Sequence, residues 1–192
     1  MDNPVSRWVE PLARWAAIAC GWAVLALSVA VTIEIFGRKL FGFSFHGVDD
    51  IGGYVLAITA TIGASYTMAM RGHTRIDVFL VRMPRRLQGL LNAAAMVTLA
   101  VFAAFAAWRG SVVLGETIEF QSVATNPLQT PLWQPQTIWL AGIVLFAAIA
   151  VVYAVHAVIL LLRGSKDLNR FYGPSSARDE LEAELKARSA QP

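Results

Sequence analysis

Charged side chains and the usual metal or redox ligands are scarce in this sequence. Asp, Glu, Lys and Arg make up only 15% of its 192 residues, and it has one cysteine and three histidines. The single Cys20 excludes an intramolecular disulfide and a thiolate metal cluster, and its apolar surroundings favour a small buried hydrophobe. The shortage of charge also excludes a soluble helical bundle, because each soluble helix would need a polar face.

Long apolar stretches are abundant instead, since 56% of the residues are hydrophobic. Four of them reach or exceed the length of about 20 mostly apolar residues that a membrane-spanning helix needs. They are Trp15–Phe36, Ile51–Met70, Leu87–Trp108 and Ile138–Leu162. The sequence therefore predicts an all-α integral membrane protein with four transmembrane helices.

The first apolar stretch is predicted to be a retained helix. A signal peptide would have an apolar centre of roughly 7–15 residues followed by a small-x-small cleavage site. This stretch is longer and runs instead into Glu34-Ile35-Phe36-Gly37-Arg38-Lys39.

The chain divides into three parts by composition. Residues 1–14 resemble an amphipathic segment lying on the membrane surface, residues 15–162 hold the four apolar stretches, and residues 163–192 form a charged tail. Within the tail, Ser176–Ala187 is predicted to form a short helix because it is rich in good helix formers.

Basic residues indicate the orientation, because cytoplasmic loops accumulate lysine and arginine. With the N-terminus inside, the cytoplasmic flanks hold Arg7, Arg14, Arg71, Arg75, Arg82, Arg85, Arg86, Arg163, Lys166 and Arg170. The opposite side holds only Arg38, Lys39 and Arg109. Both termini are therefore predicted to be cytoplasmic. The net charge of +3 then expresses membrane topology, and it does not indicate a nucleic-acid-binding surface.

The longest connection, Gly110–Thr137, is predicted to be a structured external loop against the membrane surface. It contains Pro127, Pro131 and Pro135, together with aromatic residues such as Trp133. Proline and interfacial aromatics are typical of such loops.

Ionisable residues at the membrane margin must be paired, hydrated or functional. Glu34 precedes Arg38 by four residues, so an ion pair on one helix face is expected. Asp49 and Asp50 stand at the start of the second helix, where carboxylates cap amide groups and favour the positive end of the helix dipole.

A short cytoplasmic segment follows the second helix, and it contains Arg71, His73, Arg75 and Asp77. A lone histidine in such a loop is interpreted as a hydrogen-bonding anchor in preference to a ligand or proton carrier.

Several short motifs, in this order and between four apolar stretches, resemble the small membrane subunit of tripartite ATP-independent periplasmic (TRAP) transporters. They are Glu34-x-x-x-Arg38, the acid Asp50, Gly63-Ala64, Arg71-Gly72-His73-x-Arg75-Ile76-Asp77, Pro84, and Pro127-Leu128-Gln129-Thr130-Pro131-Leu132-Trp133. The similarity runs from about Trp15 to Leu162.

The resemblance implies a non-catalytic protein of the bacterial inner membrane that takes part in sodium-coupled uptake of small organic acids. Its partners would be a large many-helix membrane subunit, which it braces, a periplasmic solute-binding protein, which it helps to dock, and membrane lipids. No cofactor, metal or nucleic acid is expected. The residues expected at structural or interface positions are Glu34, Arg38, Asp49, Asp50, Arg71, His73, Arg75, Asp77, Pro131 and Trp133.

Two other functions are consistent with a small helical membrane protein. A haem b anchor of a respiratory enzyme needs two histidines facing each other at similar depth, whereas His46 and His73 lie in loops and only His156 lies within an apolar stretch. A self-sufficient four-helix transporter would need polar or charged groups deep in its helices, and few are present there.

Overall fold

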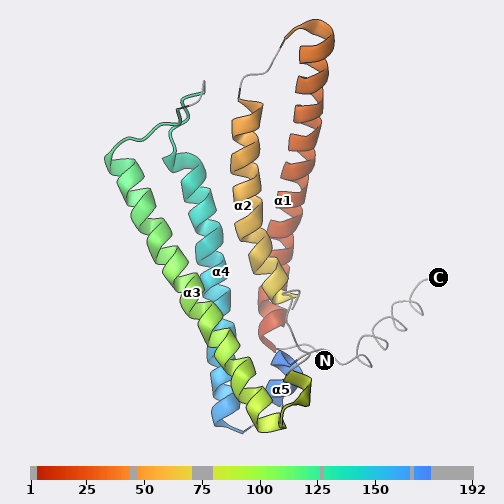
Figure 1. Cartoon of the computed structure of the whole chain (residues 1–192), viewed down its shortest axis with the longest axis vertical. Coiled ribbons are helices and arrows are strands. Elements are labelled where there is room, and N and C mark those ends of the chain that lie inside the picture. Colours follow the sequence, from red (N-terminus) through yellow and green to blue (C-terminus); the bar gives the residue numbers. More distant parts are fainter. Residues whose placement is uncertain (1–3, 44–46, 71–79, 126–127, 165–166, 174–192) are drawn as a thin grey trace, which may run out of the picture. The chain divides into compact units, whose positions relative to one another are not determined.

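The computed structural model describes residues 4–43, 47–70, 80–125, 128–164 and 167–173. Its long helices are α1 (Pro4–Phe36), α2 (Val48–Ala69), α3 (Arg85–Glu119) and α4 (Trp133–Leu162), and short helical segments are η1 (Gly37–Phe41), η2 (Leu80–Arg82) and α5 (Asp167–Tyr172) (Figure 1). Four helices in this described part of the chain are long and apolar enough to cross a membrane. The predicted all-α fold with four membrane-spanning helices is confirmed.

Helix α1 is longer than the predicted span at its N-terminal end. It is continuous from Pro4, so residues 4–14 are helical and run directly into the apolar stretch. Their position on the membrane surface stays a prediction. At the other end, α1 continues into the π-helical turn η1, and Gly42 ends it with a φ of +69°, a left-handed conformation that suits glycine.

The predicted limits of the long external loop were wrong on both sides. Helix α3 continues past Trp108 to Glu119, and α4 begins at Trp133 and not at Ile138. A helix can continue in water after its apolar stretch ends, because polar residues do not stop a helix. Residues 109–119 also contain no proline that would end it. Pro135 is tolerated in the first turn of α4, where its missing N–H would have no partner within the helix.

The chain forms two compact units, Met1–His73 with Thr98–Tyr153 and Thr74–Val97 with Ala154–Pro192. In the first unit, α1 packs along α2 (Figure 1). Three glycines mark close helix contacts there, because a Cβ atom at Gly52 would meet Leu27, one at Gly110 would lie 2.9 Å from Leu140, and one at Gly142 would overlap Thr61. Small residues let membrane helices approach closely in this way.

The second unit contains a helix that the sequence did not predict. Helix α5 follows α4 after Gly164, which has a φ of +60°, and both Leu168 and Tyr172 of α5 are buried. A Cβ atom at Gly89 of α3 would lie 3.2 Å from the Leu168 side chain, so α5 packs against the start of α3. The predicted helix Ser176–Ala187 lies outside the described residues.

Candidate functional site

The ion pair predicted at the C-terminal end of α1 is present. Arg38 Nη2 donates a hydrogen bond to Glu34 Oε2 at 3.0 Å, one helical turn away. The Glu34 side chain is only 6% exposed, whereas that of Arg38 is 60% exposed. The carboxylate is thus enclosed by protein, while the guanidinium is largely exposed.

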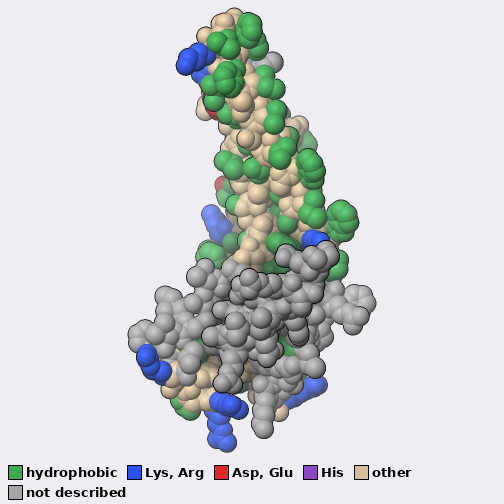
Figure 2. Space-filling model, turned by 90° about the vertical axis from the view of Figure 1, so that its right-hand side faces the viewer, with side chains coloured by type: hydrophobic (Ala, Val, Ile, Leu, Met, Phe, Trp, Pro, Cys, Tyr) green, Lys and Arg blue, Asp and Glu red, His purple; other side chains and the backbone are tan. Residues whose placement is uncertain are grey.

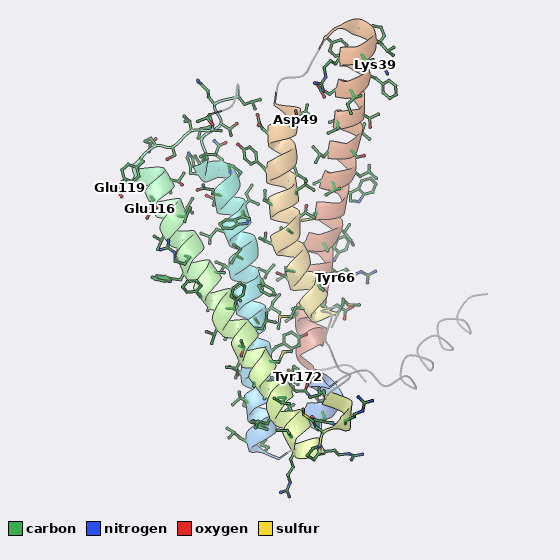
Figure 3. The ribbon with its side chains drawn as sticks, viewed as in Figure 1. Lys39, Asp49, Tyr66, Glu116, Glu119 and Tyr172 are labelled. Carbon is green, nitrogen blue, oxygen red and sulfur yellow. The ribbon has the colours of Figure 1, made fainter. Side chains whose placement is uncertain are left out.

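The two aspartates occupy the first turn of α2, as expected, and Figure 3 shows Asp49 at that end of the helix. The N-cap residue is Gly47, which has a φ of +95° and carries no side chain to cap an amide. Asp49 and Asp50 therefore favour the positive end of the helix dipole from within the first turn. They do not occupy the capping position itself.

Gly47 also lies at a contact between two connections that are far apart in the sequence. A Cβ atom placed on it would overlap the Leu128 side chain, so the connection before α2 contacts the one before α4. The left-handed backbone and this close approach both require glycine at position 47.

Pro131 and Trp133 lie where the α3–α4 connection turns into α4. Pro131 forms an isolated antiparallel bridge with Val123, and the Ala124 N–H donates to the Thr130 carbonyl at 2.9 Å. Trp133 is the first residue of α4. Main-chain hydrogen bonds therefore pair residues 122–124 with residues 130–132, as expected of a structured loop.

Arg71, His73, Arg75 and Asp77 lie outside the described residues. The anchoring role predicted for His73 and the contacts of these arginines with lipid headgroups stay predictions.

A set of polar contacts that sequence reasoning missed holds α5 in place. Asn92 of α3 donates through Nδ2 to Asn169 Oδ1 at 3.2 Å, and Asn169 Nδ2 donates to the Arg85 carbonyl at 2.8 Å. His156 Nδ1 of α4 lies 2.7 Å from the Tyr172 hydroxyl and shares a hydrogen bond with it. Tyr172, labelled in Figure 3, thereby links α5 to α4.

Two residues in the sequence, Asn92 and His156, indicate that polar contacts of this kind exist. Each is a polar side chain inside an apolar stretch, where a partner is required. Their spacing along the chain does not reveal which residues those partners are.

These arrangements are packing contacts within the chain. Among the residues that the structure describes, no group of three His, Cys, Asp or Glu side chains could hold a metal ion. The apolar parts of the four long helices, residues 15–33, 51–69, 87–108 and 133–162, contain no Asp, Glu, Lys or Arg. A transport site is usually made of broken helices and polar groups near the bilayer midplane, and the long helices here are continuous.

Comparison with protein families gives a match over residues 27–160, to the family described as tripartite ATP-independent periplasmic transporters, DctQ component. The chain belongs to the DctQ family. The resemblance to the small membrane subunit of TRAP transporters is thus confirmed, and the family favours a transporter subunit over a haem-binding anchor. The matched region of this DctQ chain begins within α1 and ends within α4, so it includes Glu34, Arg38, Asp49, Asp50, Pro131 and Trp133. The chain matches none of the curated proteins and none of the solved structures with which it was compared.

Proposed function

We propose that this DctQ chain is a structural subunit that braces the large membrane subunit of a TRAP transporter in the bacterial inner membrane. The observation that carries the proposal is the character of its four long helices, which are continuous and lack charged residues in their apolar parts. Such helices suit a scaffold, because they offer no ion or solute site near the midplane. Movement of the solute, a small organic acid taken up with sodium, then falls to the large subunit.

The outer surface of the subunit helps to dock the periplasmic solute-binding protein. With both termini in the cytoplasm, as the basic residues predict, α3 projects past Trp108 into the periplasm by about 17 Å, at about 1.5 Å per residue. This projecting part carries Glu116 and Glu119 near its end (Figure 3), next to exposed Ile118 and Phe120. Exposed apolar and charged side chains on a rigid helix are suited to protein–protein contact.

The orientation is tested by labelling a cysteine introduced at Ser122 in a Cys20→Ser background. Ser122 is in the α3–α4 connection, where its N–H donates to the Thr117 carbonyl. We expect a membrane-impermeant thiol reagent to label intact cells at position 122 from the periplasmic side. Labelling only after the cytoplasmic side is exposed would refute the proposed orientation.

The bracing role is tested by reconstitution of the complex in vesicles with a sodium gradient and saturating binding protein. Variants at the Glu34–Arg38 pair are expected to lower the amount of assembled complex and to reduce solute uptake in proportion. Uptake per assembled complex should stay at the wild-type value. A variant that assembles normally but transports many-fold more slowly, or with altered sodium dependence, would place this subunit in the transport mechanism.

A further inference from the structure

Helix α1 carries two rows of residues with the seven-residue repeat of packed helices, on nearly opposite faces. One row faces inward, and it consists of Ala13, Ala17, Cys20, Val24, Leu27, Val31 and Glu34. Within this row Ala13, Cys20 and Glu34 are buried, and Leu27 contacts α2 at Gly52. A repeat of 3.5 residues keeps one seam of a helix facing its partner over many turns.

The second row, here called the outer row, has the same repeat but no partner in the described chain. Six of its members are large apolar residues that are 41–72% exposed, namely Trp15, Ile18, Trp22, Leu25, Val29 and Phe36. The seventh is Thr32, whose hydroxyl donates to the Ser28 carbonyl of the same helix. Small residues that are also exposed flank this row, namely Ala19, Ala23, Ala26 and Ala30. Figure 2 views the molecule from the side of α1 and shows hydrophobic side chains along this helix, up to basic residues near its C-terminal end. Large residues flanked by small ones offer the knobs and close approach that helix packing needs.

Trp22 shows that lipid alone is a poor cover for the outer row. The apolar part of α1 runs from Arg14 to Glu34, so Trp22 lies about 3 Å from its midpoint, at 1.5 Å per residue. Tryptophan in membrane proteins prefers the two interfaces, where its N–H meets water or headgroups. At the midplane the Trp22 side chain is 68% exposed, and no described residue accepts a hydrogen bond from its N–H. Hydrocarbon provides no acceptor, so an unsatisfied N–H there is costly.

A second copy of this chain is an equally poor cover. Two copies inserted in the same orientation and related by a two-fold axis would place Trp22 of one against Trp22 of the other. The indole group donates a hydrogen bond and cannot accept one. A symmetric seam would therefore bring two unsatisfied donors together at the midplane.

We infer that the outer row of α1 is the surface that packs against a transmembrane helix of the large membrane subunit, and that Trp22 donates a hydrogen bond to an acceptor on that helix. The inference rests on the proposed bracing function and assigns it to one face of one helix. Suitable acceptors are a serine or threonine hydroxyl, an amide side chain, or a main-chain carbonyl at a helix break. A transport subunit with broken helices offers groups of the last kind at membrane depth.

Site-specific photo-crosslinking in native membranes tests the assignment. A photoreactive amino acid is placed at Trp22 or Val29 in the outer row, and at Phe102 of α3 as the matched control. Phe102 is an apolar position that is 64% exposed, comparable with Trp22. We expect positions 22 and 29 to give adducts with the large subunit and position 102 to give none.

Other outcomes overturn the inference in distinguishable ways. If the large subunit co-purifies with this chain but positions 22 and 29 capture only lipid, or a second copy of the chain, the assignment is wrong while the bracing function stands. If no large membrane protein co-purifies with the wild-type chain in mild detergent, both proposals fail.

A Trp22→Phe variant tests the hydrogen bond separately from the packing, because it keeps an aromatic ring and removes only the N–H donor. Hydrogen bonds between membrane helices are modest, so we expect about a 3- to 10-fold loss of affinity for the large subunit. Trp22→Ala should cost about 30-fold or more, as the loss of a central tryptophan typically does. Phe102→Leu should leave affinity unchanged. A Trp22→Phe variant that binds as tightly as wild type would refute the hydrogen bond, and a tightly binding Trp22→Ala variant would refute the interface.

Discussion

Replacing Asn169 with alanine is expected to loosen α5 from the start of α3. The asparagine side chain makes two hydrogen bonds at once, accepting from Asn92 Nδ2 at 3.2 Å and donating to the Arg85 carbonyl at 2.8 Å. Alanine removes both. The apolar contact between Leu168 and the α3 backbone at Gly89 would remain as the main attachment on that side.

The two lost hydrogen bonds differ in their cost. Arg85 is exposed, so water can replace the donor at its carbonyl with little loss. Asn92 is only 3% exposed, and a buried amide left without its partner costs about 1–3 kcal/mol. We therefore expect a loss of about 2 kcal/mol. That is equivalent to about a 30-fold rise in the population with α5 detached, and to a fall in the unfolding temperature of about 4–8 °C for a chain of this length.

Two measurements on the purified protein in detergent check this value. Thermal unfolding followed by tryptophan fluorescence gives the temperature shift, and limited trypsin digestion after Arg170 reports the detached population. An Asn169→Asp variant keeps an acceptor for Asn92, but its second carboxylate oxygen replaces the donor that faced the Arg85 carbonyl and is repelled by that carbonyl. Because the carboxylate also lies near the positive N-terminal end of α3, the variant should recover part of the stability that alanine loses. Ser111→Ala is the control, because that exposed hydroxyl only donates to the Trp108 carbonyl of its own helix.

The reasoning would be refuted if Asn169→Ala unfolded at the wild-type temperature and was cleaved at the wild-type rate. It would also be refuted if the control variant Ser111→Ala lost as much stability as Asn169→Ala. In either case the contacts of α5 would contribute little free energy.

Three further predictions concern the other parts of the chain. Glu34→Ala should lower the yield of assembled complex more than Glu34→Gln, because glutamine can still accept a hydrogen bond from Arg38. The alanine variant should lose about 1 kcal/mol, since the exposed Arg38 can be hydrated. Equal yields for both variants would contradict this prediction. Gly142→Leu should separate α2 from α4, because even a Cβ atom at Gly142 would overlap Thr61. The free energy of unfolding should fall by about 1–3 kcal/mol, measured by thermal unfolding. An unchanged unfolding temperature would show that the two helices do not pack closely at Gly142. His73→Ala should lower the amount of assembled complex and the solute uptake in the same proportion, so that uptake per assembled complex in vesicles stays at the wild-type value. A normal amount of complex with slow transport would exclude an anchoring role.

The sequence by itself determined the features that depend on local pattern. Four apolar stretches are enough to predict four membrane-spanning helices, because membrane insertion depends on the length and hydropathy of each segment. The Glu34–Arg38 pair followed from a spacing of one helical turn, which any α-helix converts into contact. The motif order that resembles the TRAP small subunit was likewise readable along the chain, and the match over residues 27–160 agrees with it.

Only the tertiary structure decided the features that join distant parts of the chain. Helix α3 continues to Glu119, beyond its apolar stretch. Hydropathy indicates where a helix leaves the membrane, and it does not indicate where the helix ends. Helix α5 is six residues long, too short to be stable alone. Its contacts with Asn92 and His156 hold it, and Asn92 is 77 residues from its partner in α5. The close contact between Gly142 and Thr61 also joins distant parts of the chain. Packing of other residues likewise decides which of the two rows on α1 is buried. Which side of a helix is covered depends on how helices pack, and hydropathy along the sequence does not record that packing.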